Sequence, residues 1–248
     1  MAGTSKIEWT EQTWNPSTGC TKISPGCKHC YAEVMAHRLQ RMKTAGYENG
    51  FRLATHHNRL NQPLQRKKPT LYFVNSMSDL FHEKVPFEFI EQVIAVIEQT
   101  PQHTYQILTK RAARMEKFFR KRKVPHNAWL GVSVENRKHG LPRIDSLRHI
   151  QAPVRFLSIE PLIEDLGRVN LTGMHWVIVG GESGPNARPM KTEWVTRIQR
   201  QCATKKIAFF FKQWGGWGSD GIKRHKSSNG RLLNGRTWDD KPEITAII

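Results

Sequence analysis

Three cysteines near the N-terminus are the residues most able to do chemistry. Cys20, Cys27 and Cys30 follow the spacing Cys-x6-Cys-x2-Cys in a stretch rich in Gly and Pro, which predicts a loop. In a chain with only four cysteines, thiols this close together are more often metal ligands than disulfide partners. We therefore expect a metal centre in a cysteine loop that spans residues 15–31.

The number of available ligands distinguishes between two kinds of metal centre. A closed zinc site takes four ligands, usually as two pairs. His29 lies between two of the cysteines, where it cannot easily turn toward the same ion, and Cys202 lies far along the chain on an apparent core helix face. Three cysteines alone suit a [4Fe–4S] cluster whose fourth iron is open to a substrate or cofactor. A structural zinc knuckle remains the alternative.

The elements that must position this loop follow from hydrophobic patterning. After residue 69, short apolar runs alternate with stretches of helical periodicity, which predicts βα units around a parallel sheet. Another strand is conceivable near residues 7–14, and helical periodicity directly follows the loop. The runs are 71–74, 105–108, 129–134, 154–159, 176–179 and 207–211, and the helical stretches begin near residues 31, 87, 115 and 194.

Polar residues follow every apolar run. Because active sites of (β/α) barrels lie at the carboxyl ends of the strands, six such ends in succession favour a barrel over a doubly wound sheet. The candidate site residues are Ser76, Asp79, Lys110, Ser133, Glu135, Glu160, Gly180, Gly181, Glu182 and Lys212.

The chain shows no internal repeat and no long linker, so we expect one domain over residues 1–248. Within it, the cysteine loop precedes βα units at about residues 70–214 and a basic, Gly- and Trp-rich C-terminal segment, 215–248. Residues 43–68 look like an insertion. No apolar run approaches the ~20 residues that span a bilayer, and the polar N-terminus lacks a secretory signal. We expect a cytoplasmic monomer without membrane contact.

The net charge predicts a polyanionic partner. Lys and Arg total 39 against 21 Asp and Glu, which gives +18. Nucleic acid is favoured over an acidic membrane surface, and DNA over RNA. A solvated basic face and tryptophans that only close the barrel are the alternatives to phosphate contact and base stacking. The residues expected to contact nucleic acid are Arg111, Arg114, Arg120, Arg122, Lys212 and Trp214.

Taken together, these motifs resemble the radical S-adenosylmethionine (SAM) superfamily. The usual spacing there is Cys-x3-Cys-x2-Cys, from which this loop departs. The closer resemblance is to an uncharacterised phage-associated branch, carried by Gly-Cys…Ser-Pro-Gly-Cys…Cys-Tyr-Ala-Glu. Further matching stretches are Phe73-Val-Asn-Ser-Met-Ser-Asp79, Leu108-Thr-Lys110-Arg and Ile178-Val-Gly-Gly181-Glu-Ser-Gly184.

The resemblance implies a partial (β/α)6-type barrel in which SAM chelates the open iron of a [4Fe–4S] cluster. An electron donor would reduce the cluster, and cleavage of SAM would give a 5′-deoxyadenosyl radical that abstracts hydrogen from a substrate. Ser76, Asp79 or backbone carbonyls would receive the SAM amino group, and Lys110 its carboxylate. The other implied cofactor contacts are Ser133 and Glu135 to the ribose, Gly180 and Gly181 to the methionyl or adenine part, and Glu160 and Glu182 nearby.

The substrate expected from the charge is nucleic acid, whose bases the enzyme would repair or modify. A DNA-lesion lyase of the spore photoproduct lyase type is one version, by class analogy. A radical SAM enzyme acting on a peptide or small molecule is the near alternative. A zinc-stabilised, non-catalytic nucleic-acid-binding protein is the alternative from a different class.

Overall fold

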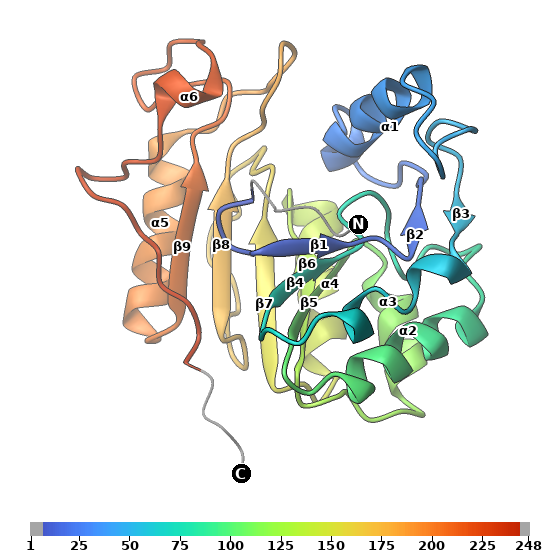
Figure 1. The fold of residues 1–248 in the computed structure, drawn as a ribbon. Coiled ribbons are helices and arrows are strands. Elements are labelled where there is room, and N and C mark those ends of the chain that lie inside the picture. Colours follow the sequence, from blue (N-terminus) through green and yellow to red (C-terminus); the bar gives the residue numbers. More distant parts are fainter. Residues whose placement is uncertain (1–6, 244–248) are drawn as a thin grey trace.

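The computed structural model describes residues 7–243 and has a curled, open parallel sheet at its centre (Figure 1). Every pair of neighbouring strands in this sheet is parallel, as in a partial barrel. The six expected strands and the additional one near residues 7–14 are confirmed. In spatial order the strands are β1 (Gln12–Trp14), β4 (Leu71–Val74), β5 (Thr104–Thr109), β6 (Ala128–Ser133), β7 (Val154–Ile159), β8 (Trp176–Gly180) and β9 (Ala208–Gln213).

Four helices connect consecutive strands of the sheet. They are α2 (Phe87–Gln99), α3 (Ala112–Phe119), α4 (Arg137–Arg148) and α5 (Thr192–Thr204). The sequence patterning missed α4, because Gly140 and Pro142 interrupt its helical signal. A Cβ at Gly140 would lie 2.7 Å from Val134 Cγ1, so the missing side chain lets α4 approach the sheet. Within the described residues the connection from β7 to β8 has no helix, so one βα unit is incomplete.

Two hydrophobic clusters cover the two faces of the sheet. The larger cluster joins the helices to alternate strand residues such as Leu130 and Val177. The smaller one fills the opposite, concave face with aromatic rings of Trp9, Trp129 and Trp176. Since successive strand residues point to opposite faces, this aromatic layer also fixes which residues face inward nearer the strand ends.

The cysteine loop and the segment 43–68 form a small second layer beside the sheet. Its elements are β2 (Ser17–Thr18) antiparallel to β3 (Ala54–Thr55), α1 (Tyr31–Arg41), and the 3₁₀ turns η1 (Pro25–Cys27), η2 (His57–Arg59) and η3 (Pro63–Gln65). The expected insertion therefore supports the loop, since β3 pairs with β2 directly before Cys20.

The helix after the loop is confirmed, but the face that carries its large apolar residues is not the face that is buried. Ala32 and Ala36 are buried against Tyr47 and Met77, whereas Val34 is 70% exposed. The small inward residues let α1 lie close to its support, and the large ones face solvent.

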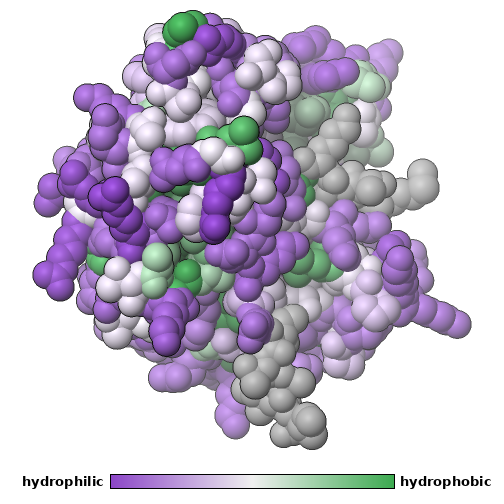
Figure 2. Space-filling model, turned by 90° about the vertical axis from the view of Figure 1, so that its left-hand side faces the viewer, coloured by the Kyte–Doolittle hydropathy of each residue, from purple (hydrophilic) through white to green (hydrophobic). Residues whose placement is uncertain are grey.

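The C-terminal segment covers the edge strand β9. Phe211 donates its N–H to the carbonyl of Trp238, and Asp240 donates to that of Phe209, so the edge is not left open for pairing with another chain. The segment also holds α6 (Lys226–Asn229). Figure 2 shows that this side of the molecule is mostly hydrophilic, with only small separate apolar areas. Across residues 7–243, none of the helices has the length and apolar character needed to cross a membrane.

Candidate functional site

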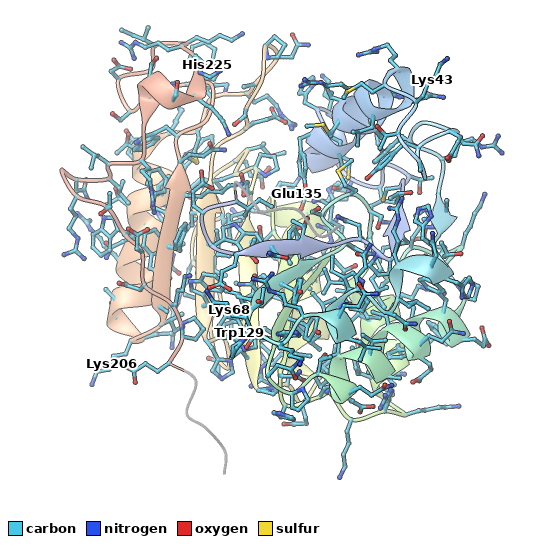
Figure 3. The ribbon with its side chains drawn as sticks, in the orientation of Figure 1. Lys43, Lys68, Trp129, Glu135, Lys206 and His225 are labelled. Atoms are coloured by element: carbon cyan, nitrogen blue, oxygen red, sulfur yellow. The ribbon has the colours of Figure 1, made fainter. Side chains whose placement is uncertain are left out.

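The site lies where the strands end, on the concave face of the sheet. On β6, Trp129 belongs to the aromatic layer, and Ser133 and Glu135 follow it on the same face at even spacing. Figure 3 shows Trp129 low on the sheet and Glu135 at its upper end, close to the cysteine loop. The neighbouring strands contribute Lys110 and Glu160 in the same way.

Arg111 connects the cysteine loop to the end of β5. Its guanidinium forms an ion pair of 3.0 Å with Asp79 and lies 3.5 Å from Cys20 Sγ. It also donates to the carbonyl oxygen of Thr21 at 3.1 Å and to Glu83 at 2.7 Å. The side chains of Arg111 and Asp79 are only 4% and 8% exposed, so this is a buried ion pair that fixes one end of the loop.

Asp79 is saturated by donors from its own surroundings. Its carboxylate accepts hydrogen bonds from Thr109 Oγ1 at 2.7 Å, from the Lys110 N–H at 3.1 Å and from the Phe81 N–H at 3.0 Å. Asp79 therefore closes a turn with Phe81 and also forms the ion pair with Arg111. An interaction of Asp79 with a SAM amino group stays a prediction.

Glu135 lies under the middle of the cysteine loop. It is fully buried and pairs with Arg143 at 2.5 Å, and it accepts a hydrogen bond from the Ser24 hydroxyl. A Cβ added at Gly26 would lie 2.7 Å from Glu135 Cγ, so only glycine lets the loop rest on this side chain. Burial raises the pKa of Glu135, but Lys110 and Arg143 outweigh it and hold the pKa below its ordinary value.

A second ion pair, between buried Glu182 and half-buried Arg188, follows β8. The two side chains are joined at 2.6 and 2.8 Å, and Arg188 also donates to the Pro25 carbonyl of the cysteine loop at 3.0 Å. Burial raises the pKa of Glu182, but the hydrogen bonds from Arg188 bring it below its ordinary value. The cysteine loop is thus held from β8 as well as from β5 and β6.

The remaining candidates lie around the same edge. Lys110 Nζ donates to Ser133 Oγ at 3.2 Å, and Lys212 Nζ pairs with both oxygens of Glu160 at 2.8 and 3.0 Å. Glu160 is therefore held in a salt bridge on the concave face. Tyr31 Oη donates to the Ser76 carbonyl, which ties the start of α1 to the end of β4.

The two glycines after β8 have different surroundings. A Cβ on Gly181 would lie 1.9 Å from the Trp214 carbonyl oxygen, so this glycine permits close packing of two chain segments. A Cβ on Gly180 would lie 3.2 Å from the Glu160 carboxyl carbon. A cofactor contact at either glycine stays a prediction.

The three loop cysteines are free and partly exposed, whereas Cys202 is free and buried. Burial and the Asp79 charge raise the pKa of Cys20 to about 11 despite Arg111, and burial raises the pKa of Cys202 to about 12. Within residues 7–243, no three His, Cys, Asp or Glu side chains converge closely enough to hold a single metal ion.

The donor set is compatible with an iron–sulfur cluster. Three partly exposed thiols lie in one loop, with the Arg111 guanidinium near Cys20 and the Ser24 hydroxyl 3.7 Å from Cys27 Sγ. Donors near the sulfurs are among the features that set the properties of such clusters. Cys202 is a buried core residue of α5, apart from this loop.

The residues expected to contact nucleic acid do not form one surface. Arg111 is buried, and Arg114 donates to the Val85 carbonyl at 2.6 Å. Lys212 is paired on the concave face, and Trp214 is 2% exposed with its N–H bonded to the Leu232 carbonyl. For Trp214 the prediction of an exposed stacking surface is wrong, because the ring closes the end of the core against Phe211.

Arg120 and Arg122 lie at the opposite end of the strands from the cysteine loop. Arg120 pairs with Glu116, and Arg122 with Glu91 and Glu98. They line a basic groove together with residues 149–151, which immediately precede β7. This groove is at the amino ends of the strands, away from the cysteine loop, and nucleic-acid contact by Arg120 and Arg122 stays a prediction.

Sequence reasoning missed three residues that hold the loop. Ser24, Arg143 and Arg188 all contact Glu135, Glu182 or the loop itself. Arg143 lies in the helix that was missed, and Arg188 is one basic residue among many. Only Ser24, within the cysteine loop, could have been found from its position.

Comparison with known proteins adds a fold likeness. Spore photoproduct lyase complexed with dinucleoside spore photoproduct superposes with a TM-score of 0.52 at 14% identity, over 81% of this chain and 63% of the lyase. A mutant lyase with the same dinucleoside gives 0.53 at 14% over the same shares, and another mutant gives 0.52 at 15% over 73% and 58%. The chain thus spans less than two thirds of the lyase. At this identity the likeness shows a shared fold.

No curated protein matches the chain, and its resemblance to a phage-associated branch stays a hypothesis. A family model matches residues 4–242. The chain therefore belongs to the family described as "Protein of unknown function (DUF5131)".

Proposed function

We propose that this protein is a radical SAM enzyme that acts on nucleic acid. The observation that carries the proposal is the position of the cysteine loop. Its three free thiols belong to a loop that contacts residues at the ends of β4, β5, β6 and β8. The fold shared with spore photoproduct lyase, a radical SAM enzyme, supports the proposal.

Cys20, Cys27 and Cys30 would hold a [4Fe–4S] cluster, with SAM at the open iron. When bound, this cofactor pair supplies a 5′-deoxyadenosyl radical on one-electron reduction. The chain's own residues position and neutralise charges around it. Lys110, held at Ser133, offers a cation to a carboxylate, and the Glu160 carboxylate offers an acceptor to an amino group.

Burial and ion pairing keep these side chains in defined places. Glu135 is fixed by Arg143, and Glu160 by Lys212, so neither carboxylate moves freely. Since fixed dipoles and charges need no rearrangement during a reaction, this edge of the sheet is suited to hold a charged cofactor. A role of Ser133 or Glu135 at the ribose belongs to the same proposal.

The proposed substrate class is DNA. The charge of +18 supports it, and so does the dinucleoside spore photoproduct with which the lyase of similar fold is complexed. Exposed cations of the C-terminal segment are better placed for phosphate contact than the buried arginines. Lys223 lies over the Trp217 ring at 5.8 Å, and Lys226 is exposed at the start of α6.

Anaerobic reconstitution tests the cofactor proposal. The loaded protein should be brown, contain about four irons, and release 5′-deoxyadenosine from SAM with dithionite. Variants with Ala at Cys20, Cys27 or Cys30 should each lose iron and product, whereas Cys202→Ala is the matched control and should keep both. A colourless, zinc-loaded protein that leaves SAM intact would contradict the proposal.

Salt-dependent binding tests the substrate class. Affinity for a DNA oligonucleotide should fall steeply as salt rises, and Lys226→Ala should reduce the slope by about one phosphate contact. An RNA oligonucleotide of the same sequence is the comparison. Affinity that is independent of salt would contradict a nucleic-acid substrate without affecting the cofactor test.

A further inference from the structure

The outward face of α1 is the most apolar exposed surface among the described residues. Eight large hydrophobic side chains are substantially exposed in residues 7–243, and five of them lie between positions 23 and 42. Large apolar side chains that cluster at the surface mark interaction sites, whereas single ones do not. The five are Ile23 (38%), Tyr31 (60%), Val34 (70%), Met35 (40%) and Met42 (62%).

The helical spacing places three of these side chains, Val34, Met35 and Met42, on the same side of α1, whereas Tyr31 turns its hydroxyl to the Ser76 carbonyl at the end of β4. Positions three, four and seven residues apart share one face of a helix, so Arg38 follows Val34, and Met42 follows Met35 and Arg38 on the same face. The opposite face is already buried through Ala32 and Ala36. Nothing in the fold requires large apolar residues on the outer side, so an external contact is the role they fit.

The charge around this face has one sign. Glu33 is the sole carboxylate of α1 and is paired with Lys22 at 2.7 Å. Lys28, Arg38, Arg41 and Lys43 are exposed, and among the described residues none of them has an ion-pair partner. Lys43 projects outward beyond the end of α1 in Figure 3. The face therefore combines an apolar centre with a basic rim and would attract an acidic partner.

The composition favours a protein over a nucleic acid as that partner. Met and Arg are enriched at the centres of protein interfaces, and this face contains both. Phosphate binding alone would need cations but not the side chains of Val34 and Met35, which are exposed at some cost. A short helix face is also small, as are the interfaces of transient electron-transfer complexes.

The place of α1 in the chain indicates what the partner does. The helix begins at Tyr31, directly after Cys30, and Cys30 packs against the cluster that supports the helix. A protein seated on the outer face of α1 would thus lie next to the cysteine loop. We infer that this face docks an acidic, one-electron donor protein, an inference that rests on the proposed function. One electron leaves the donor and enters the site, and no bond forms or breaks.

Direct binding and two reductants test this inference with the reconstituted full chain. A flavodoxin and a [2Fe–2S] ferredoxin, both acidic, serve as probes in calorimetric titrations and, after reduction, as electron sources. At least one should bind wild type more weakly as salt rises. Val34→Glu and Arg38→Glu should each weaken that binding at least tenfold and slow donor-driven 5′-deoxyadenosine formation to the same degree.

Dithionite separates docking from chemistry because a small reductant needs no docking surface. With dithionite, both α1 variants should form 5′-deoxyadenosine within about twofold of wild type. Ile222→Glu, an exposed apolar residue of the C-terminal segment at 53% exposure, is the matched control and should keep binding and both activities.

Three outcomes would overturn the inference. The first is that neither probe binds wild type, and the second is that the α1 variants bind as tightly as Ile222→Glu. The third is that Val34→Glu loses affinity for a DNA oligonucleotide but not for the probes, which would assign the face to nucleic acid. If dithionite yields no 5′-deoxyadenosine even with wild type, the proposed function itself fails.

Discussion

The guanidinium of Arg111 contacts both Cys20 in the cysteine loop and the Asp79 carboxylate at the end of the sheet. The pair with Asp79 is 3.0 Å long and almost inaccessible to solvent. Removing one member of such a pair leaves an uncompensated buried charge, which costs more than the pair itself contributes.

Replacing Arg111 should therefore destabilise the protein strongly. We expect Arg111→Met to lower the free energy of unfolding by about 3 kcal/mol, measured by urea denaturation. Arg120→Met is the matched control. Arg120 is 71% exposed in its i,i+4 pair with Glu116, so the loss should be below about 0.5 kcal/mol. Equal losses for the two variants would show that the Arg111–Asp79 pair is not structurally important.

The thiols should differ in reactivity. In the metal-free protein, iodoacetamide should leave Cys202 unmodified until the chain unfolds, because that thiol is buried and its pKa is raised to about 12. Cys20, with a pKa raised to about 11, should react faster by about tenfold for each unit of pH between 7 and 10, since the thiolate is the nucleophile. Peptide mapping by mass spectrometry distinguishes the sites. Rapid modification of Cys202 at neutral pH would contradict the placement of α5.

Stability should fall in acid through Glu182. Burial raises the pKa of this carboxyl, but the hydrogen bonds and charge of Arg188 lower it by more than burial raises it. The folded pKa therefore lies below the unfolded value of about 4.3. A lowered folded pKa adds stability above the unfolded pKa, and that stability is lost as pH falls through the folded value. The urea midpoint should decline below about pH 4.3, and Glu182→Gln should flatten this decline. An unchanged acid slope in Glu182→Gln would contradict the linkage.

Packing of the concave face should depend on Gly131. A Cβ there would lie 2.4 Å from Phe156 Cζ, and the ring cannot withdraw from a filled aromatic layer. Gly131→Ala should therefore cost about 1–3 kcal/mol by overpacking. Adding Phe156→Leu should recover part of that loss in a urea titration. A Gly131→Ala variant as stable as wild type would show that the layer has room to adjust.

The strands were predictable from sequence because buried parallel strands require continuous apolar runs. Runs such as Leu71–Val74 and Val154–Ile159 appear as strands with the predicted bounds. Helix α4 was not predictable in this way, since Gly140 and Pro142 weaken its local helical preference and tertiary packing of the surrounding residues compensates.

The sequence predicted that the candidate site lies at the strand ends. It did not predict which charged side chains pair with one another there. The alternation of side chains along a strand places Lys110, Ser133 and Glu135 on one face. Which cation pairs with which carboxylate depends on residues far apart in sequence. Arg111 therefore looked like a surface residue in a basic run, although its partner Asp79 lies in the preceding connection. The roles of these residues toward SAM stay predictions.

The order of the strands in the sheet follows their order in the chain, with a consequence for folding during synthesis. When each strand is synthesised, the strand that it pairs with has already been synthesised. The sheet can therefore form from its N-terminal strand onward as the chain leaves the ribosome. The cysteine loop, by contrast, depends on contacts with residues that are synthesised much later. Its contacts to Arg111, Glu135 and Arg188 span 91, 111 and 163 residues, so the thiols are among the first groups synthesised and among the last to be enclosed. Until Arg188 has left the ribosome, the loop lacks its support from β8, and the nascent chain carries three unprotected thiols.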